Sequence, residues 1–194
     1  MQTVLEELLL AEEASGSPIR RYLRPALSSA EIRDRLLGIG LAAPDELVEL
    51  YAWHDGTDQS AWLADSHHNN LCLLPFARFV PLDQAVSDYL ELKRTWQDTD
   101  WYEDYLAGND PGWGYWRTEW FPVFQSDKWR HAVDCLAPDS NPVWHVYFEP
   151  FPKTEPVHAS LSELVQVLAG HFKRGDCFWS ADRQQLTDTL DYGL

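Results

Sequence analysis

The chain is poor in cysteine and in basic residues, and it contains no long apolar run. Its three cysteines, Cys72, Cys135 and Cys177, are widely spaced and form no CxxC pair, so neither a zinc ribbon nor a redox pair is predicted. We interpret them as buried free thiols of a reducing compartment. No stretch approaches the roughly 18 consecutive apolar residues of a membrane-spanning helix, and acids rather than bases flank the apolar run near the start. The sequence therefore predicts neither a transmembrane segment nor a secretory signal, and we expect a cytoplasmic protein.

Sequence signatures of catalysis and of cofactor binding are also missing. The chain has no G-x-S-x-G nucleophile motif, no G-x-x-x-x-G-K-[ST] phosphate loop and no G-x-G-x-x-G dinucleotide motif. His54, Asp55, His67 and His68 have the side-chain types of a zinc site, but their spacing matches no metal signature. We therefore predict a protein without enzymatic activity, bound metal or cofactor. A metal-dependent hydrolase that uses these four residues is the less favoured alternative.

Acidic residues outnumber basic residues by 31 to 15, which gives a net charge of −16. Such a chain is repelled by nucleic acid and by anionic membrane surfaces, so neither is expected as a partner. The imbalance is concentrated in residues 36–77 and 95–116, two windows without Lys or Arg. Two interpretations remain open for these windows: solvated helix faces and loops, or a negative surface that attracts a basic partner.

Tryptophan is abundant, with ten in the chain and five between positions 96 and 120. Aromatic side chains interleaved with acids are typical of protein-binding surfaces, where the rings supply buried anchors and the carboxylates supply specificity. The same segment could instead pack on the core as a lid, or stack on a carbohydrate. The candidate partner-binding residues from both signals are Asp55, Asp58, Asp65, Asp98, Asp100, Trp101, Glu103, Asp104 and Trp113.

Local patterns predict helices that alternate with short strands. Ser28 with Glu31, and Ser160 with Glu163, have the S-x-x-E spacing of a capping box, which marks the start of a helix. Helices are expected at residues 3–14, 28 to 38 or 40, 44–54, 81–96, 160–172 and 181–190. Strands are expected at 71–74, 120–124, 131–136 and 143–148, and irregular loops at 58–70 and 97–118.

The short turns between the last three strands favour an antiparallel meander. The order of elements predicts an α+β fold in a single domain that spans residues 1–194. We expect its core to cover about residues 28–174, with the helices at 3–14 and 181–190 as appendages.

Three segments together resemble one known family. Residues 44–56 (PDELVELYAWHDG) resemble a proline, helix, tyrosine and Asn/Asp-Gly element. Residues 120–136 (WFPVFQSDKWRHAVDCL) resemble a hairpin that opens with W-x-P-[VI], and residues 157–172 resemble a closing S-[LF]-x-x-[LF] helix. These are similar to motifs of the SUKH superfamily, named partly for yeast cell-wall-synthesis regulators. The hairpin turn, Ser126-Asp127-Lys128, departs from the Gly-Asp or Gly-Gly that the family often has there.

The resemblance implies a central antiparallel sheet of about four to six strands flanked by helices. It also implies a function in binding rather than catalysis. Bacterial members resemble immunity proteins, which neutralise a cognate toxin, often a nuclease, by direct contact, and fungal relatives are regulatory interaction modules. The expected partner is therefore another protein, in the first place a basic toxin domain, with a regulatory or housekeeping module as the alternative.

Overall fold

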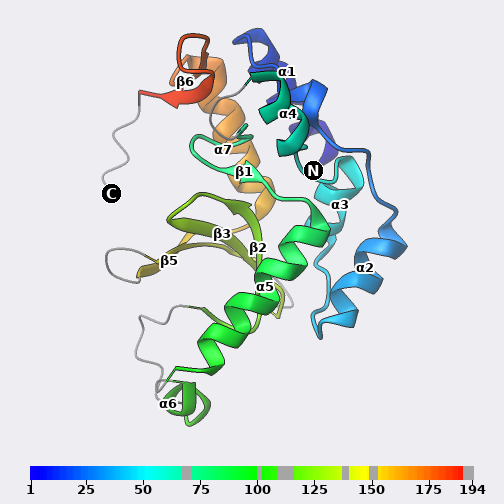
Figure 1. Ribbon diagram of the computed structural model, residues 1–194, viewed down its shortest axis with the longest axis vertical. Helices are drawn as coiled ribbons and strands as arrows, with labels where there is room; N and C mark the ends of the chain where they lie inside the picture. Colours follow the sequence, from blue (N-terminus) through cyan, green and yellow to red (C-terminus); the bar gives the residue numbers. More distant parts are fainter. Residues whose placement is uncertain (67–70, 100–101, 109–115, 137–139, 149–152, 190–194) are drawn as a thin grey trace.

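The computed structural model describes residues 1–66, 71–99, 102–108, 116–136, 140–148 and 153–189, and it shows an α+β fold (Figure 1). Its helices are α1 (Gln2–Ala14), the 3-10 turn η1 (Ile19–Tyr22), α2 (Ser29–Gly38), α3 (Asp45–Trp53), α4 (Gln59–Ser66), α5 (Leu82–Gln97), α6 (Tyr102–Leu106) and α7 (Leu161–Arg174). Its strands are β1 (Arg78–Phe79), β2 (Trp120–Gln125), β3 (Trp129–Asp134), β4 (Val143–Tyr147), β5 (Lys153–His158), β6 (Cys177–Ser180) and β7 (Gln185–Asp188).

Strands β1 to β5 form one antiparallel sheet in the order of the chain, and β6 pairs with β7 in a separate hairpin. The expected central meander is thus confirmed. The register places Trp129 opposite Tyr147 and His131 opposite His145. Because alternate side chains of a strand point to the same face, these four rings lie on one face of the sheet. That face lies toward α7 and is where the pocket described below is found.

The helix starts follow the predicted caps. The Ser28 hydroxyl accepts a hydrogen bond from the amide of Glu31 (3.2 Å), and the Ser160 hydroxyl accepts one from the amide of Glu163 (3.1 Å). Helix α7 then ends at Gly175, whose φ of 79° is the left-handed conformation that favours glycine at this position. The capping signals therefore place α2 and α7 correctly in the sequence.

The core extends beyond the predicted residues 28–174. Helix α1 exists as predicted, but it packs against α7, and its Leu5, Leu8 and Leu9 side chains are fully buried. At the other end, Leu186 of β7 is buried as well. The segments expected to be appendages are therefore parts of the core, where each buried leucine contributes roughly 1.5–3 kcal/mol.

Residues 97–118, which were predicted to be irregular, contain the short helix α6, and two further segments also differ from the prediction. Residues 58–70 contain α4, which is anchored by the buried ring of Trp62 against Tyr22 (5.3 Å between ring centroids). Residues 71–74 are buried, yet they form no strand: Leu74 bridges to Ala77 across a tight turn, and the sheet begins only at β1. In both places, tertiary packing overrides what the local composition favours.

The helix predicted at residues 181–190 is wrong, and four strands of the structure, β1, β5, β6 and β7, were not predicted. Residues 185–188 form β7, in which Leu186 pairs with Trp179 of β6. Strand β5 contains Pro156, which cannot donate a hydrogen bond to a ladder. It is tolerated because β5 is the edge of the sheet and its register with β4 shifts next to that proline.

Candidate functional site

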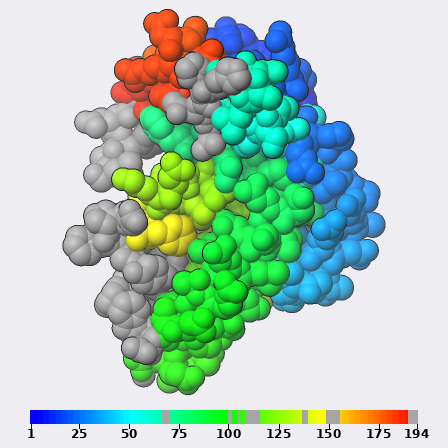
Figure 2. All heavy atoms as spheres, in the orientation of Figure 1, coloured from blue at the N-terminus to red at the C-terminus, as the bar shows by residue number. Residues whose placement is uncertain are grey.

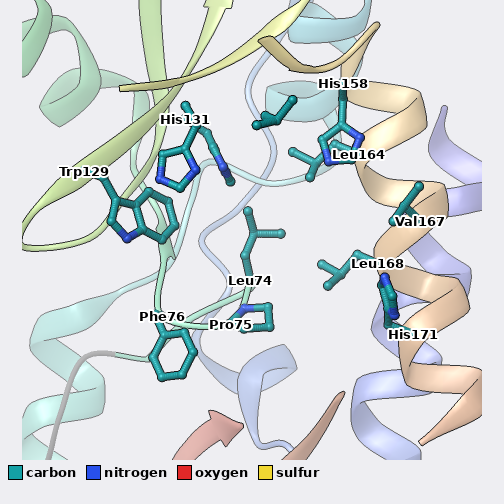
Figure 3. Close-up of a pocket in the computed structure, with 12 residues that line it drawn as sticks. Leu74, Pro75, Phe76, Trp129, His131, His158, Leu164, Val167, Leu168 and His171 are labelled. Atoms are coloured by element: carbon teal, nitrogen blue, oxygen red, sulfur yellow. The ribbon is translucent and has the colours of Figure 1, made fainter. Parts of the chain in front are cut away.

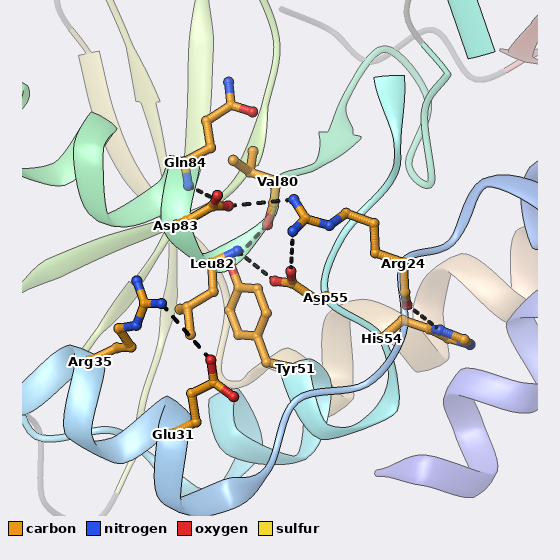
Figure 4. A network of polar contacts seen from close by, with 10 residues as sticks. All are labelled: Arg24, Glu31, Arg35, Tyr51, His54, Asp55, Val80, Leu82, Asp83 and Gln84. Atoms are coloured by element: carbon orange, nitrogen blue, oxygen red, sulfur yellow. Dashed lines mark hydrogen bonds and ion pairs between the residues drawn. The ribbon is translucent and has the colours of Figure 1, made fainter. Parts of the chain in front are cut away.

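Asp55 was expected to offer charge to a partner, but its side chain is buried, with 4% of the residue exposed. Its Oδ1 accepts a hydrogen bond from the amide of Leu82 (2.7 Å), the first residue of α5, and its Oδ2 lies 3.0 Å from the Arg24 guanidinium (Figure 4). Burial raises the pKa of Asp55, and the Leu82 amide and Arg24 oppose that rise. The assignment of Asp55 to a binding surface is therefore wrong, and the residue holds α5 in place.

The residues next to Asp55 also make contacts that hold the fold. Nδ1 of His54 lies 2.8 Å from the carbonyl oxygen of Arg24, and the Tyr51 hydroxyl donates to the Val80 carbonyl (3.0 Å). Gly56 has a φ of 73°, and a Cβ there would lie 2.4 Å from the backbone nitrogen of Pro81. The described residues contain no cluster of three or more ligand side chains able to hold a metal ion, while His67 and His68 lie outside them.

Asp58, just before α4, and Asp65, within α4, are exposed, and both accept hydrogen bonds from nearby groups of the protein. Asp58 accepts a hydrogen bond from the Ala61 amide (2.9 Å) and so caps α4. Asp65 accepts one from the Tyr22 hydroxyl (2.8 Å). Both carboxylates therefore have partners inside the protein, and their exposure alone does not indicate a binding role.

The acids around α6 differ in this respect. Asp98, Glu103 and Asp104 are exposed, and within the described part of the chain their carboxylates form no ion pair or hydrogen bond. Helix α6 lies at the lower end of the molecule and α4 near the upper end (Figure 1), and the space-filling view shows the same separation (Figure 2). The described acids of α4 and those around α6 therefore do not share one face. Asp100, Trp101 and Trp113 lie outside the described residues.

The tryptophans of the 96–120 segment whose positions are described belong to the core. Trp96, Trp116 and Trp120 are all buried. Trp120 meets Trp116 edge-on (6.0 Å between centroids) and stacks on Trp144 (4.9 Å), with the Arg117 guanidinium 5.3 Å from the Trp120 ring centre. For these three rings, the interpretation as core is the correct one.

A pocket that the sequence did not predict lies between the sheet and α7. It has a volume of about 350 Å³ and opens between strands β3 to β5, helix α7 and the 74–77 turn (Figure 3). Leucines and a valine of α7 form one wall, and the rings on the sheet form the other. Four histidines from four places in the sequence line it: His131, His145, His158 and His171.

The sheet side of the pocket is a cluster of rings. The centroids of His131 and His145 are 4.7 Å apart, and Trp129 lies 4.8 Å from His131 and 4.5 Å from His145. Burial lowers the pKa of His131 well below 6.5, and His145 and His158 lower it further, so its ring is neutral at pH 7. Its Nδ1 is buried without a hydrogen-bond partner, and no other described group bonds the ring.

Phe76 stands at the rim of the pocket in an uncommon conformation. Pro75 and Phe76 form the turn in which Leu74 and Ala77 exchange backbone hydrogen bonds of 3.1 and 3.0 Å. Phe76 has a φ of 64°, a region that costs a residue with a Cβ about 1 kcal/mol or more, and the residue is 53% exposed. A bulky apolar residue is therefore held exposed where glycine or asparagine would fit better.

The pocket could not be predicted from the sequence, because each of its histidines lies 13 or 14 residues from the next and the spacing matches no motif. The one usable signal was the alternation in β3 and β4, which puts His131 and His145 on the same face as Trp129 and Tyr147. Comparison with known proteins adds no assignment: no family model matches the chain, and no curated protein matches it either. None of the described helices is long and apolar enough to cross a membrane.

Proposed function

We propose that the chain is a non-enzymatic domain that binds a basic protein through the acids around α6, and that it acts as an immunity protein against a bacterial toxin. The observation that supports the proposal is that Asp98, Glu103 and Asp104 are exposed and have no partner among the residues that the structure describes. Their charge is thus available to a cation outside the chain. The resemblance to the SUKH superfamily supplies the narrower expectation of a toxin.

Electrostatic reasoning explains how such a surface would act. A net charge of −16 accelerates the encounter with a basic partner, and unpaired carboxylates at the contact fix its orientation. A toxin that cuts nucleic acid has a basic cleft for phosphates, and an acidic domain seated on that cleft blocks it. Neutralisation would then follow from occlusion and would need no catalytic group.

The alternative is a regulatory or housekeeping module of the same fold, which would use the same surface on a different protein. The metal-dependent hydrolase has less support, because His54 and Asp55 already bond Arg24 and Leu82. Chelator treatment distinguishes that alternative, since a hydrolase would lose activity when its metal is removed.

The test is co-expression with candidate toxin domains, beginning with any that is encoded beside the gene of this protein. We expect growth to be restored and the two purified proteins to bind directly, with an association rate that falls as salt is raised. The double variant Glu103→Gln/Asp104→Asn should slow association about 10-fold at low salt.

The matched control removes the same charge elsewhere. Asp34 on α2 and Asp182 between β6 and β7 are also exposed acids, so Asp34→Asn/Asp182→Asn should change the rate by no more than about 2-fold. If both double variants slow association equally, the α6 acids contribute only through the net charge of the protein and do not form the contact surface. A toxin that still kills in the presence of excess protein would contradict the proposed function.

A further inference from the structure

The pocket between the sheet and α7 has the size and chemistry of a small-molecule site. Its volume of about 350 Å³ lies at the lower end of the range for ligand pockets. Leu74, Leu164 and Leu168 are buried residues in its wall, and Val167 stands partly exposed at its edge. Such walls favour an apolar ligand with few heavy atoms.

The polar groups of the pocket favour a neutral ligand. The described lining contains no Lys, Arg, Asp or Glu, and a charged ligand would lose its hydration there without gaining a counter-ion. His171 is already engaged, because its Nδ1 lies 3.0 Å from the Asp176 carboxylate. His131 is not engaged, so its neutral imidazole keeps a hydrogen-bonding capacity that the protein does not use.

The rings of the pocket favour an aromatic ligand. Trp129 and His131 present their rings from the sheet, and Phe76 adds an exposed ring at the rim (Figure 3). The ring of His145 packs against both sheet rings. Aromatic pairs attract one another beyond the gain from burial of their area, because the edge of one ring is complementary to the face of the other. The cost of the left-handed Phe76 backbone is consistent with a ring retained for contact with a ligand.

We propose that this pocket binds a small uncharged aromatic molecule with one hydroxyl group, of the phenol class, with its ring between Trp129 and the α7 leucines and its hydroxyl hydrogen-bonded to His131. The site is separate from the acids of α6, which lie at the far end of the molecule (Figure 1). The proposal therefore does not depend on the proposed partner, and either can fail without the other.

The experiment titrates the full-length protein at pH 8 with three probes of similar size: 4-ethylphenol, ethylbenzene and 4-ethylbenzoate. Affinity is measured by calorimetry, and the site is located by amide chemical-shift changes. We expect 4-ethylphenol to bind about 3- to 10-fold more tightly than ethylbenzene, the ratio that one net hydrogen bond supplies. Binding of 4-ethylbenzoate should be weaker still, and the shifts should centre on residues 74–77, β3, β4 and α7.

Two variants distinguish the contribution of the hydrogen bond to affinity from the contribution of the cavity. His131→Phe keeps a ring but removes both nitrogens, so it should lower the affinity for 4-ethylphenol to that for ethylbenzene and leave ethylbenzene unchanged. Val167→Trp should block all three probes at the pocket edge, while Leu37→Trp, at an exposed position of α2, should block none. Circular dichroism and thermal unfolding check that each variant is folded.

The opposite results would overturn the proposal. They are equal affinity of the wild-type protein for 4-ethylphenol and ethylbenzene, shifts that centre elsewhere, or no saturable binding. If His131→Phe does not fold, Val167→Trp and the ranking of the probes on the wild-type protein still decide the question.

Discussion

The polar groups around Asp55 and those around His131 differ in whether they have hydrogen-bond partners inside the protein. Around Asp55, each carboxylate oxygen has a partner: the Leu82 amide for one and Arg24 for the other. Around His131, the ring packs among other rings, but its nitrogens bond no described group. Folded proteins satisfy nearly all of the buried polar groups that hold the fold together. The comparison therefore assigns Asp55 to the structure of the fold and leaves His131 available to a ligand.

The largest effect is expected from a substitution of Asp55, whose two carboxylate oxygens both have partners. Asp55→Ala leaves the Leu82 amide and the Arg24 guanidinium without their partner, and we expect the free energy of unfolding to fall by about 3 kcal/mol. Asp55→Asn keeps an acceptor for the amide and should lose less than half as much. Urea denaturation of both variants measures the difference. A loss below about 1 kcal/mol for Asp55→Ala would mean that the network does not hold the fold.

An intermediate effect on stability is expected when the pH is lowered and His131 in the pocket is protonated. The pKa of His131 is lowered below 6.5 in the folded protein, so the unfolded chain binds more protons than the native state below that pH. Stability should therefore be complete above about pH 6.5 and fall on acidification, by at most about 1.4 kcal/mol per pH unit from this residue.

The control for this titration is His131→Phe, which removes the ionisable group and keeps a ring. Its stability should change less between pH 7.5 and pH 5 than that of the wild-type protein, as measured by thermal unfolding across the range. Parallel pH profiles for the two proteins would show that His131 is not the source of the acid sensitivity.

The smallest effect concerns the rim of the pocket. Phe76→Asn places a residue that tolerates positive φ in the 74–77 turn, so we expect the free energy of unfolding to rise by about 0.5–1 kcal/mol. Affinity for 4-ethylphenol should fall at the same time because the rim ring is gone. Lower stability in this variant would instead show that the Phe76 ring packs for the fold.

Part of the fold could be predicted from local sequence, and part could not. Capping boxes at Ser28 and Ser160 depend on residues three apart, so the starts of α2 and α7 could be predicted from the sequence. The hairpin of β6 and β7 depends on Trp179 meeting Leu186 and on burial of Leu186 against the rest of the core. That burial is a long-range event, and a local pattern that also suits a helix could not reveal it.

The candidate site shows the same division. The sequence marked Asp55, Asp58, Asp98, Glu103 and Asp104 alike, because a carboxylate looks the same in a sequence whether it is bonded or free. Only the structure separates them: Asp55 is buried, Asp58 caps α4, and the other three have no partner in the described part of the chain.

By itself, then, the sequence determined the net charge, the capped helices and the antiparallel meander, since these depend on composition or on neighbours close in the chain. Tertiary structure alone decided which acids are bonded within the described part of the chain and which are not. It also brought His131, His145, His158 and His171 around one cavity. Strand register and the packing of α7 on the sheet join residues up to 40 positions apart, and no local pattern encodes such distances.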